Sequence, residues 1–518
     1  MKYFKIWQLI FVSLAFILNA IRADGPQTPL EKAGFSKLTS HSEMMTYLKS
    51  LENESGGFNS SIIGTSLQGR DIPALFFTAD TEFAQNKDNK PVVLIFCQQH
   101  GDEPSGKEAA LMLARYLSGE GRSLLKKLDL ILVPMVNPDG AEIGKRTNAA
   151  KMDLNRNHVI LSEPEAQAVH DLFLKWKPHV TLDVHEYNAI TKSWISQGFV
   201  KDADEMLGGV TNLNIDKQLI DFTRQIIIPE TGRLINDAGF SFHRYIVGGP
   251  PEKKRIRYST TNINDGRQSL GIYNTLSFII EGKRYGDILN KIEYRTRGQL
   301  AAQTAFLKVI ADNSETVIKL VNSSREKILQ NSPVEYIYIQ MDYFPDSEND
   351  SLLFPVFDIS QWKRVYKKMG NFEPDVKIKK SIKKPFAYIF SQKEAGLTAL
   401  LKKHQIKMRR LERNTLVPVE NYKILNTFNG MDEDKPILLA DVEKESVSLN
   451  YKKGDIVIQL NQPAGNLIPL LLEPQSTWNV CRKRNGHQYR LSEYLEAGKD
   501  YPIKRIMKLI DLKFKEDK

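Results

Sequence analysis

Cysteine is almost absent from this chain: Cys97 and Cys481 are the only two among its 518 residues. That count argues against a disulfide framework, and a chain of this length can fold on its hydrophobic core alone. Cys97 lies within an apolar run and is expected to be a small buried side chain. Internal repeats and low-complexity tracts are also absent from the sequence, so neither a repeat protein nor a compositionally biased one is indicated.

A strong charge of one sign is missing too. The net charge of +10 is mild for a chain of this size. The basic clusters at 252–257 and 407–413 lack interleaved aromatic residues and any recognisable binding motif. We therefore interpret them as solvated faces and expect no nucleic-acid partner.

The apolar segment at the N-terminus is short for a membrane-spanning helix. Lys2 and Lys5 precede the run "IWQLIFVSLAFILNA", and small residues follow at Ala20 and Ala23. This pattern is typical of a secretory signal peptide. We expect residues 1–23 to be that signal, the protein to be secreted or periplasmic, and no stable membrane span to remain after cleavage.

The chain is long enough for two or more domains. From about residue 24 to 315, strand-like runs such as "PVVLIFCQQ" alternate with helix-like patterns such as "SGKEAALMLARYL". This alternation predicts an α/β fold with a mostly parallel or mixed central sheet and helices on both faces. Residues 316–518 show a different pattern, which predicts a C-terminal domain that is α+β or rich in β-strands.

Three of the predicted strands end in side chains that carry chemistry. His100 and Glu103 lie in "HGDEP", His185 ends "TLDVH", and Glu281 ends "LSFIIE". In open α/β sheets, ligands bind outside the carboxyl ends of the strands. A single histidine after a strand is usually structural, but three such endings in one predicted sheet indicate a shared site.

Two imidazoles and one carboxylate form the ligand set of a catalytic zinc ion, which keeps a fourth position for water. His100, Glu103 and His185 are therefore the candidate ligands. The His-Glu-x-x-His signature of other zinc proteases is missing, because Ala189 stands where its second histidine would be. Glu281 remains available as general base for the metal-bound water.

An ordered series of fragments between residues 91 and 285 resembles the zinc carboxypeptidases of the carboxypeptidase A type. The fragments are "HGDEP", "NPDG", "KRTNAAKMDLNRNH", "TLDVHEY" and "FIIEGKRYG". The resemblance implies one Zn²⁺ per chain on the three ligands named above, with Glu281 as base. Segments near the C-terminus resemble a bacterial-type branch of this family that carries an added domain, so we expect a catalytic domain at 24–315 and an accessory domain at 316–518.

The resemblance also implies roles for the segment "KRTNAAKMDLNRNH". Arg146 would polarise the scissile carbonyl group, and Asn155 and Arg156 would grip the terminal carboxylate of the substrate. A guanidinium fork suits a planar carboxylate, which agrees with these roles. Asp153 would orient a zinc-binding histidine through a hydrogen bond.

The family has a mobile tyrosine some twenty residues before the catalytic glutamate, and this sequence matches that feature imperfectly. Tyr258 is the nearest candidate. Tyr273 is the alternative, although "LGIYNTLSF" is more typical of strand packing.

In the family, the interval between that tyrosine and the glutamate floors the pocket for the terminal side chain. Here it holds one acid, Asp265, and one base, Arg267. Two residues apart on an extended strand, both side chains would share a face. Asp265 would favour a terminal Lys or Arg, whereas Arg267 would favour a terminal Glu or diaminopimelate. We favour Arg267, because Asp265 and Gly266 resemble a turn that directs the acid outward.

The sequence therefore predicts a secreted zinc metallocarboxypeptidase that hydrolyses the C-terminal peptide bond of peptides or proteins. A related group of zinc deacylases, which cleave N-acyl amino acids, is one alternative; the "NPDG" turn, Arg146 and the signal favour a peptidase. A relative that only binds peptide ends is the other. Such a relative would be expected to have lost Glu281 or a zinc ligand, and none is lost.

Overall fold

The computed structural model describes residues 25–85, 87–250, 253–330, 336–346, 348, 350–432, 435–481, 483–484, 487–488 and 491–515. The predicted signal peptide lies outside these residues. Among the residues that are described, no helix is both long enough and apolar enough to cross a membrane.

A mixed eight-stranded sheet forms the centre of the N-terminal part, in the order β1-β2-β4-β3-β5-β11-β7-β8. The four strands in the middle, β4, β3, β5 and β11, run parallel to one another. They are almost wholly buried, as expected for strands covered on both faces. The bounds are β1 (Asn59–Thr65), β2 (Asp71–Phe77), β3 (Val92–Cys97), β4 (Asp129–Val133), β5 (Val180–Asn188), β7 (Glu205–Gly209), β8 (Phe242–Arg244) and β11 (Leu276–Arg284).

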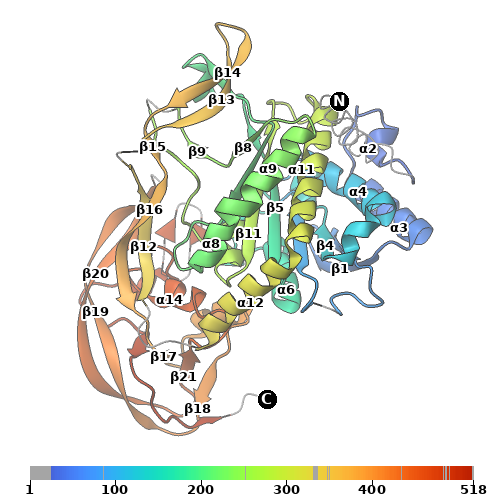
Figure 1. Cartoon of the computed structure of the whole chain (residues 1–518). Helices are drawn as coiled ribbons and strands as arrows, with labels where there is room; N and C mark the ends of the chain where they lie inside the picture. The colour runs from blue at the N-terminus through green and yellow to red at the C-terminus, as the bar shows by residue number, and fades with distance from the viewer. Residues whose placement is uncertain are drawn as a thin grey trace.

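Helices α4 (Ser105–Ser118), α9 (Ile228–Asp237) and α11 (Ile292–Asp312) pack together on one face of this sheet (Figure 1). Phe278 of β11 meets Phe306 of α11, with ring centroids 5.0 Å apart. Gly106 lets α4 approach β5, because a Cβ there would lie 2.5 Å from a methyl group of Val184.

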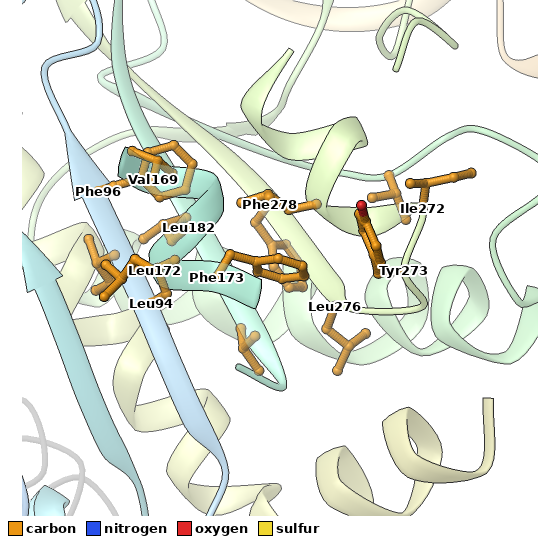
Figure 2. Packing of buried hydrophobic residues seen from close by; sticks show 14 of the residues in the cluster. Leu94, Phe96, Val169, Leu172, Phe173, Leu182, Ile272, Tyr273, Leu276 and Phe278 are labelled. Carbon is orange, nitrogen blue, oxygen red and sulfur yellow. The ribbon is translucent and has the colours of Figure 1, made fainter. Parts of the chain in front are cut away.

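The opposite face is covered by α6 (Pro164–Trp176) and the short α10 (Gly266–Gly271). Figure 2 shows Val169, Leu172 and Phe173 of α6 against Leu94 and Phe96 of β3. The predicted α/β fold with helices on both faces is therefore confirmed. Further helices of this part are α2 (Pro29–Lys32), α3 (His41–Ser55), α5 (Pro138–Glu142), α7 (Lys192–Ile195) and α8 (Lys217–Phe222).

After α12 (Ser314–Gln330) the chain is rich in β-structure, as predicted. An antiparallel seven-stranded sheet has the order β20-β19-β24-β17-β21-β18-β25, and its long β19–β20 hairpin runs along one side of the molecule (Figure 1). The bounds are β17 (Ala387–Phe390), β18 (Arg409–Leu411), β19 (Thr415–Asp432), β20 (Lys435–Tyr451), β21 (Ile456–Gln459), β24 (Lys504–Ile506) and β25 (Phe514–Lys515), with helices α13 (Ala395–Lys403) and α14 (Leu467–Leu472).

Two small sheets combine strands from before and after α12. In one, β13 (Leu352–Asp358) lies between β14 (Lys363–Met369) and β6 (Phe199–Lys201). In the other, β15 (Phe372–Glu373) pairs with β10 (Ile256–Arg257), which also pairs with β9 (Val247–Gly248). A separate two-stranded sheet joins β12 (Tyr336–Phe344) to β16 (Asp375–Lys383).

The first of these shared sheets adjoins a hydrophobic cluster of its own. Tyr187 and Trp194 from the N-terminal part pack there with Phe354, Val356 and Phe372 from the C-terminal part. Residues beyond the predicted domain boundary near 315 thus complete the structure next to the end of β5. The boundary itself stays a prediction.

Candidate active site

His100, Glu103 and His185 come together at the carboxyl ends of β3 and β5. All three are buried, and one possible ligand atom from each lies within 4.8 Å of the others. Glu103 links the two rings: its Oε1 is 2.8 Å from Nδ1 of His100, and its Oε2 is 2.9 Å from Nδ1 of His185. Among the residues that the structure describes, no other group of three or more His, Cys, Asp or Glu side chains converges in this way.

This donor set fits a metal ion. Nε2 of His100 lies 3.2 Å from Asp153, and Nε2 of His185 lies 2.7 Å from Asp183. Each aspartate favours the tautomer with its proton on Nε2, which turns the lone pairs of both Nδ1 atoms inward. The two Nδ1 atoms are 3.1 Å apart, and inward lone pairs at that distance repel one another unless a cation lies among them. Two imidazoles and a carboxylate are a zinc ligand set.

The loop after β3 can fold this tightly because of Gly101. A Cβ at this position would lie 2.1 Å from the carbonyl carbon of Gly140, so only glycine fits against the "NPDG" segment. Asn137 fixes the same contact from the other side: its amide accepts a hydrogen bond from the Gly140 N–H and donates one to the Gln99 carbonyl. The short turn from His100 to Glu103 then brings the side chains of these two residues together.

Asp183 was missed by the sequence analysis. It lies two residues before His185 on β5, so both side chains are on one face of the strand. Its carboxylate also accepts hydrogen bonds from the Gln99 side chain at 2.9 Å, and Gln99 in turn contacts His158 at 2.7 Å. The Asp-x-His spacing on a predicted strand could have revealed it.

Glu281 stands beside His185 on the neighbouring strand, in register with it. Burial raises the pKa of Glu281 to about 7; the nearby His185 acts in the opposite direction and Glu103 adds to the rise. No hydrogen bond holds the Glu281 side chain within the described part of the chain. A half-buried carboxylate with a pKa near neutrality, next to the metal ligands, suits a general base.

Two further carboxylates near the site are already engaged. Asp102 forms an ion pair with Arg284 at 3.2 Å. Glu186 pairs with Arg295 at 2.6 Å and accepts a hydrogen bond from the first N–H of α4. Glu186 is therefore not available as an alternative base without breaking these contacts, whereas Oδ1 of Asp102 is buried without a hydrogen-bond partner.

Arg146, Asp153 and Asn155 all reach the metal group. Arg146 forms an ion pair with Asp153 at 3.0 Å, and its Nη1 lies 3.2 Å from Nδ1 of His100. The Asn155 amide lies 3.2 Å from Nε2 of His185 and accepts a hydrogen bond from the Gly266 N–H. Arg156 follows in the same short turn, partly exposed, and donates to the Asn155 carbonyl. The predicted charge-handling segment therefore lies at the site.

Asp265 and Arg267 are both buried and form an ion pair at 3.2 Å. The expected extended strand is wrong, because Asp265 caps the N-terminus of α10 by accepting a hydrogen bond from the Gln268 N–H. The acid is thus not directed outward but used twice within the protein. Arg267 donates to Ser259, whereas its Nε and Nη1 are buried and make no hydrogen bond.

Neither tyrosine named from the sequence has a recorded contact with the metal group. Tyr258 packs against Phe372 and under Arg244, whose guanidinium carbon is 3.4 Å from the ring centroid. Tyr273 is a core residue that packs on Phe173, as Figure 2 shows. Tyr245 lies nearer to Glu281, whose charge adds to burial in raising the pKa of the Tyr245 hydroxyl. The Arg267 guanidinium lies 5.6 Å from the centroid of the Tyr245 ring. No signal in the sequence distinguished it.

Comparison with known proteins finds similarity to carboxypeptidases. The model of the zinc carboxypeptidase family matches residues 44–198. Carboxypeptidase 2 from Trichophyton rubrum is 24% identical over 446 residues, which cover 82% of this chain and 80% of that protein. Carboxypeptidase D from Drosophila melanogaster is 34% identical over 113 residues, covering 18% of this chain and 8% of that protein.

Among solved structures, a metallo-carboxypeptidase from Burkholderia cenocepacia aligns with a TM-score of 0.42 and 18% identity, over 54% of this chain and 71% of that one. The matched segment 44–198 holds the three converging side chains at the ends of β3 and β5. Over this segment the chain is similar to the zinc carboxypeptidase family.

Proposed function

We propose that this protein is a zinc-dependent carboxypeptidase that removes the C-terminal residue of peptides or proteins. The observation that carries the proposal is the convergence of His100, Glu103 and His185, with Glu281 in register beside them. Zn²⁺ held by these three ligands would supply a Lewis acid that polarises a carbonyl group and lowers the pKa of water.

The protein's own residues would divide the remaining work. Arg156 and the Asn155 amide would hold the terminal carboxylate, which restricts cleavage to the last peptide bond. Arg146, next to the metal ligands, would stabilise negative charge on the scissile carbonyl oxygen. Glu281 would take a proton from the attacking water and return it to the leaving amine. Asp153 and Asp183 would hold the two histidine rings in place.

The proposed preference at the C-terminus is for an acidic side chain, taken by Arg267. Both oxygens of Asp265 are used, one by the Gln268 N–H and one by Arg267. Arg267 is the partner with donors to spare, because its Nε and Nη1 are buried without a hydrogen bond. An incoming carboxylate would satisfy them, whereas an apolar side chain would leave them unsatisfied, which is costly.

We further propose that the protein is secreted or periplasmic, on the strength of the signal pattern in residues 1–23. The peptide substrate is the only partner that this account needs, apart from one Zn²⁺ per chain.

Peptides that differ only in their last residue test the proposal. With Glu, Lys or Phe at the end, release of that residue should be fastest for Glu, and a chelator should abolish all three reactions. Arg267→Ala should remove the order of preference. If Arg267→Ala and Asp265→Ala both leave the order unchanged, this pocket does not set specificity. N-acyl amino acids cleaved faster than peptides would point to a deacylase.

A further inference from the structure

Lys201 occupies an unusual position on β6, the one strand that the N-terminal part contributes to the sheet with β13 and β14. Its backbone pairs with Val356 of β13. Its ammonium nitrogen lies 4.5 Å from the ring centroid of Tyr187 and 6.0 Å from that of Trp194. The C-terminal part of the chain thus holds in place the strand that presents this lysine.

Tyr187 connects Lys201 to the active site. It lies two residues after His185 on β5, so the two side chains leave the strand on the same face. Glu281 is level with His185 on the adjacent strand, and Lys283 is level with Tyr187. The Lys201 ammonium, over the Tyr187 ring, is therefore next to a residue that lies two positions after the zinc ligand His185 on β5. Tyr187 is on the face of the sheet that also carries Glu281, the general base.

The Lys201 ammonium has no carboxylate within ion-pair distance in the described regions of the chain. Neighbouring Lys283 differs, since it pairs with Asp202 at 2.7 Å and with Asp204 at 2.6 Å. Burial lowers the pKa of Lys201 to about 8, and the charge of Glu281 partly offsets this effect. The charged form therefore still predominates at neutral pH, in a place shielded by two aromatic rings.

We propose that Lys201 binds the side-chain carboxylate of the substrate residue that precedes the scissile bond. This inference rests on the proposed carboxypeptidase function. Arg156 lies in the short turn 154–156, which is hydrogen-bonded to the first residue of α10, and Arg267 lies in α10; in the proposed function these two arginines bind the terminal residue. In the proposed binding mode the preceding residue would lie on the other side of the bond, toward Lys201 and Tyr187. A half-buried ammonium without a carboxylate partner in the described residues gains most from an acidic side chain there.

Peptides with one fixed terminal residue and Glu, Gln or Lys before it test the proposal. The quantity to measure is kcat/KM at pH 6.5. The parent enzyme should prefer Glu over Gln by at least about tenfold, the effect of one charge-assisted hydrogen bond, and Lys should be the poorest. In Lys201→Met the Glu-to-Gln ratio should fall to about 1. Lys201→Arg should restore a ratio above 1.

Lys319→Met on α12 is the matched control, because it removes one exposed lysine far from the site and should keep the parent ratio. A parent enzyme without preference for Glu, or a Lys201→Met enzyme that retains it, overturns the proposal. If the parent cleaves none of these peptides, the proposed function fails instead. Equilibrium binding of the same peptides to Glu281→Gln and to its double variant with Lys201→Met then still decides the role of Lys201.

Discussion

Two aspartates determine which nitrogen of each histidine faces the metal group. Asp153 holds Nε2 of His100, and Asp183 holds Nε2 of His185. Asp153 was expected from the family's motif, whereas Asp183 lies in a strand that looked wholly structural. Ligands at strand ends can be predicted because their type and position are visible in the sequence. A partner inside a strand can be recognised only when the face it shares with the ligand is known.

Glu281→Gln is the most direct change at the base. The variant should keep its fold and its metal, because the Glu281 side chain makes no hydrogen bond in the described structure, yet lose at least about 10²-fold in kcat. Steady-state kinetics together with metal analysis of the purified variant measure both effects. Near-normal turnover would mean that a residue other than Glu281 is the base. The nearby carboxylates of Asp102 and Glu186 form ion pairs with Arg284 and Arg295.

Arg156→Ala should chiefly raise KM for substrates with a free C-terminal carboxylate. The side chain is partly exposed and its only recorded hydrogen bond is to the Asn155 carbonyl, so the fold should not depend on it. Losing one charge-assisted contact should cost roughly tenfold in kcat/KM or more. Parallel assays with C-terminally amidated peptides provide the control, since amides lack the group that Arg156 binds. If the parent enzyme cleaved amidated and free peptides equally well, the proposed carboxypeptidase function would be contradicted.

At the scale of elements, helix α10 shows why the terminal pocket was only half predictable. Asp265 and Arg267 were expected to lie two apart on an extended strand, with a turn at Asp265 and Gly266 directing the acid outward. Asp265 instead caps the six-residue helix α10, and Arg267 is buried in the first turn of that helix. Asp265 also accepts a hydrogen bond from Arg267, so both of its oxygens have partners within the protein. A capping residue and a pocket residue look alike in sequence. Only the backbone geometry separates the two roles.

A row of buried histidines joins α6 to the C-terminal part. Nδ1 of His158 lies 3.0 Å from Nε2 of His170, whose ring meets that of His404 edge-on at 5.8 Å. His404 follows α13 and donates to the Val159 carbonyl through Nε2 at 2.7 Å. Burial lowers the pKa of all three rings, to about 4 for His158 and His404.

These shifts predict a loss of stability in mild acid. The pKa of His404 is about 4 in the folded protein and about 6.5 when unfolded, so the unfolded state binds more protons between these values. Stability is therefore full above pH 6.5 and falls as the pH drops toward 4. His404 alone should cost about 2 kcal/mol between pH 7 and 5. Denaturant unfolding of the parent and of His404→Gln checks this: the variant should lose less, and an identical pH profile would refute the assignment.

At the scale of the whole molecule, the two parts of the chain share sheets and a hydrophobic cluster. The alternation of strand-like and helix-like segments predicted the central sheet and its helices, since each kind of segment can be recognised from its local pattern. It did not predict that β13 would pair with β6 or β15 with β10. Strands of two or three residues carry too little pattern to identify a partner more than a hundred residues away.

Phe354→Ala tests how strongly the two parts are joined. Phe354 is fully buried, 4.7 Å from the ring of His243 and 6.4 Å from that of Trp194. Its truncation should destabilise the protein by about 3–5 kcal/mol. If the parts unfold together, calorimetry should show a single transition that shifts to lower temperature. Two separate transitions, with only one of them moved, would mean that the shared cluster does not couple them.

The central claim is that His100, Glu103 and His185 hold one catalytic zinc ion. Titration of metal-free protein with Zn²⁺, while release of the last residue from a peptide is followed by mass spectrometry, tests it most directly. Activity should rise from zero and saturate at one zinc per chain, and neither His100→Ala nor His185→Ala should bind zinc stoichiometrically. Full zinc occupancy in those two variants, or full turnover by metal-free protein, would contradict the account.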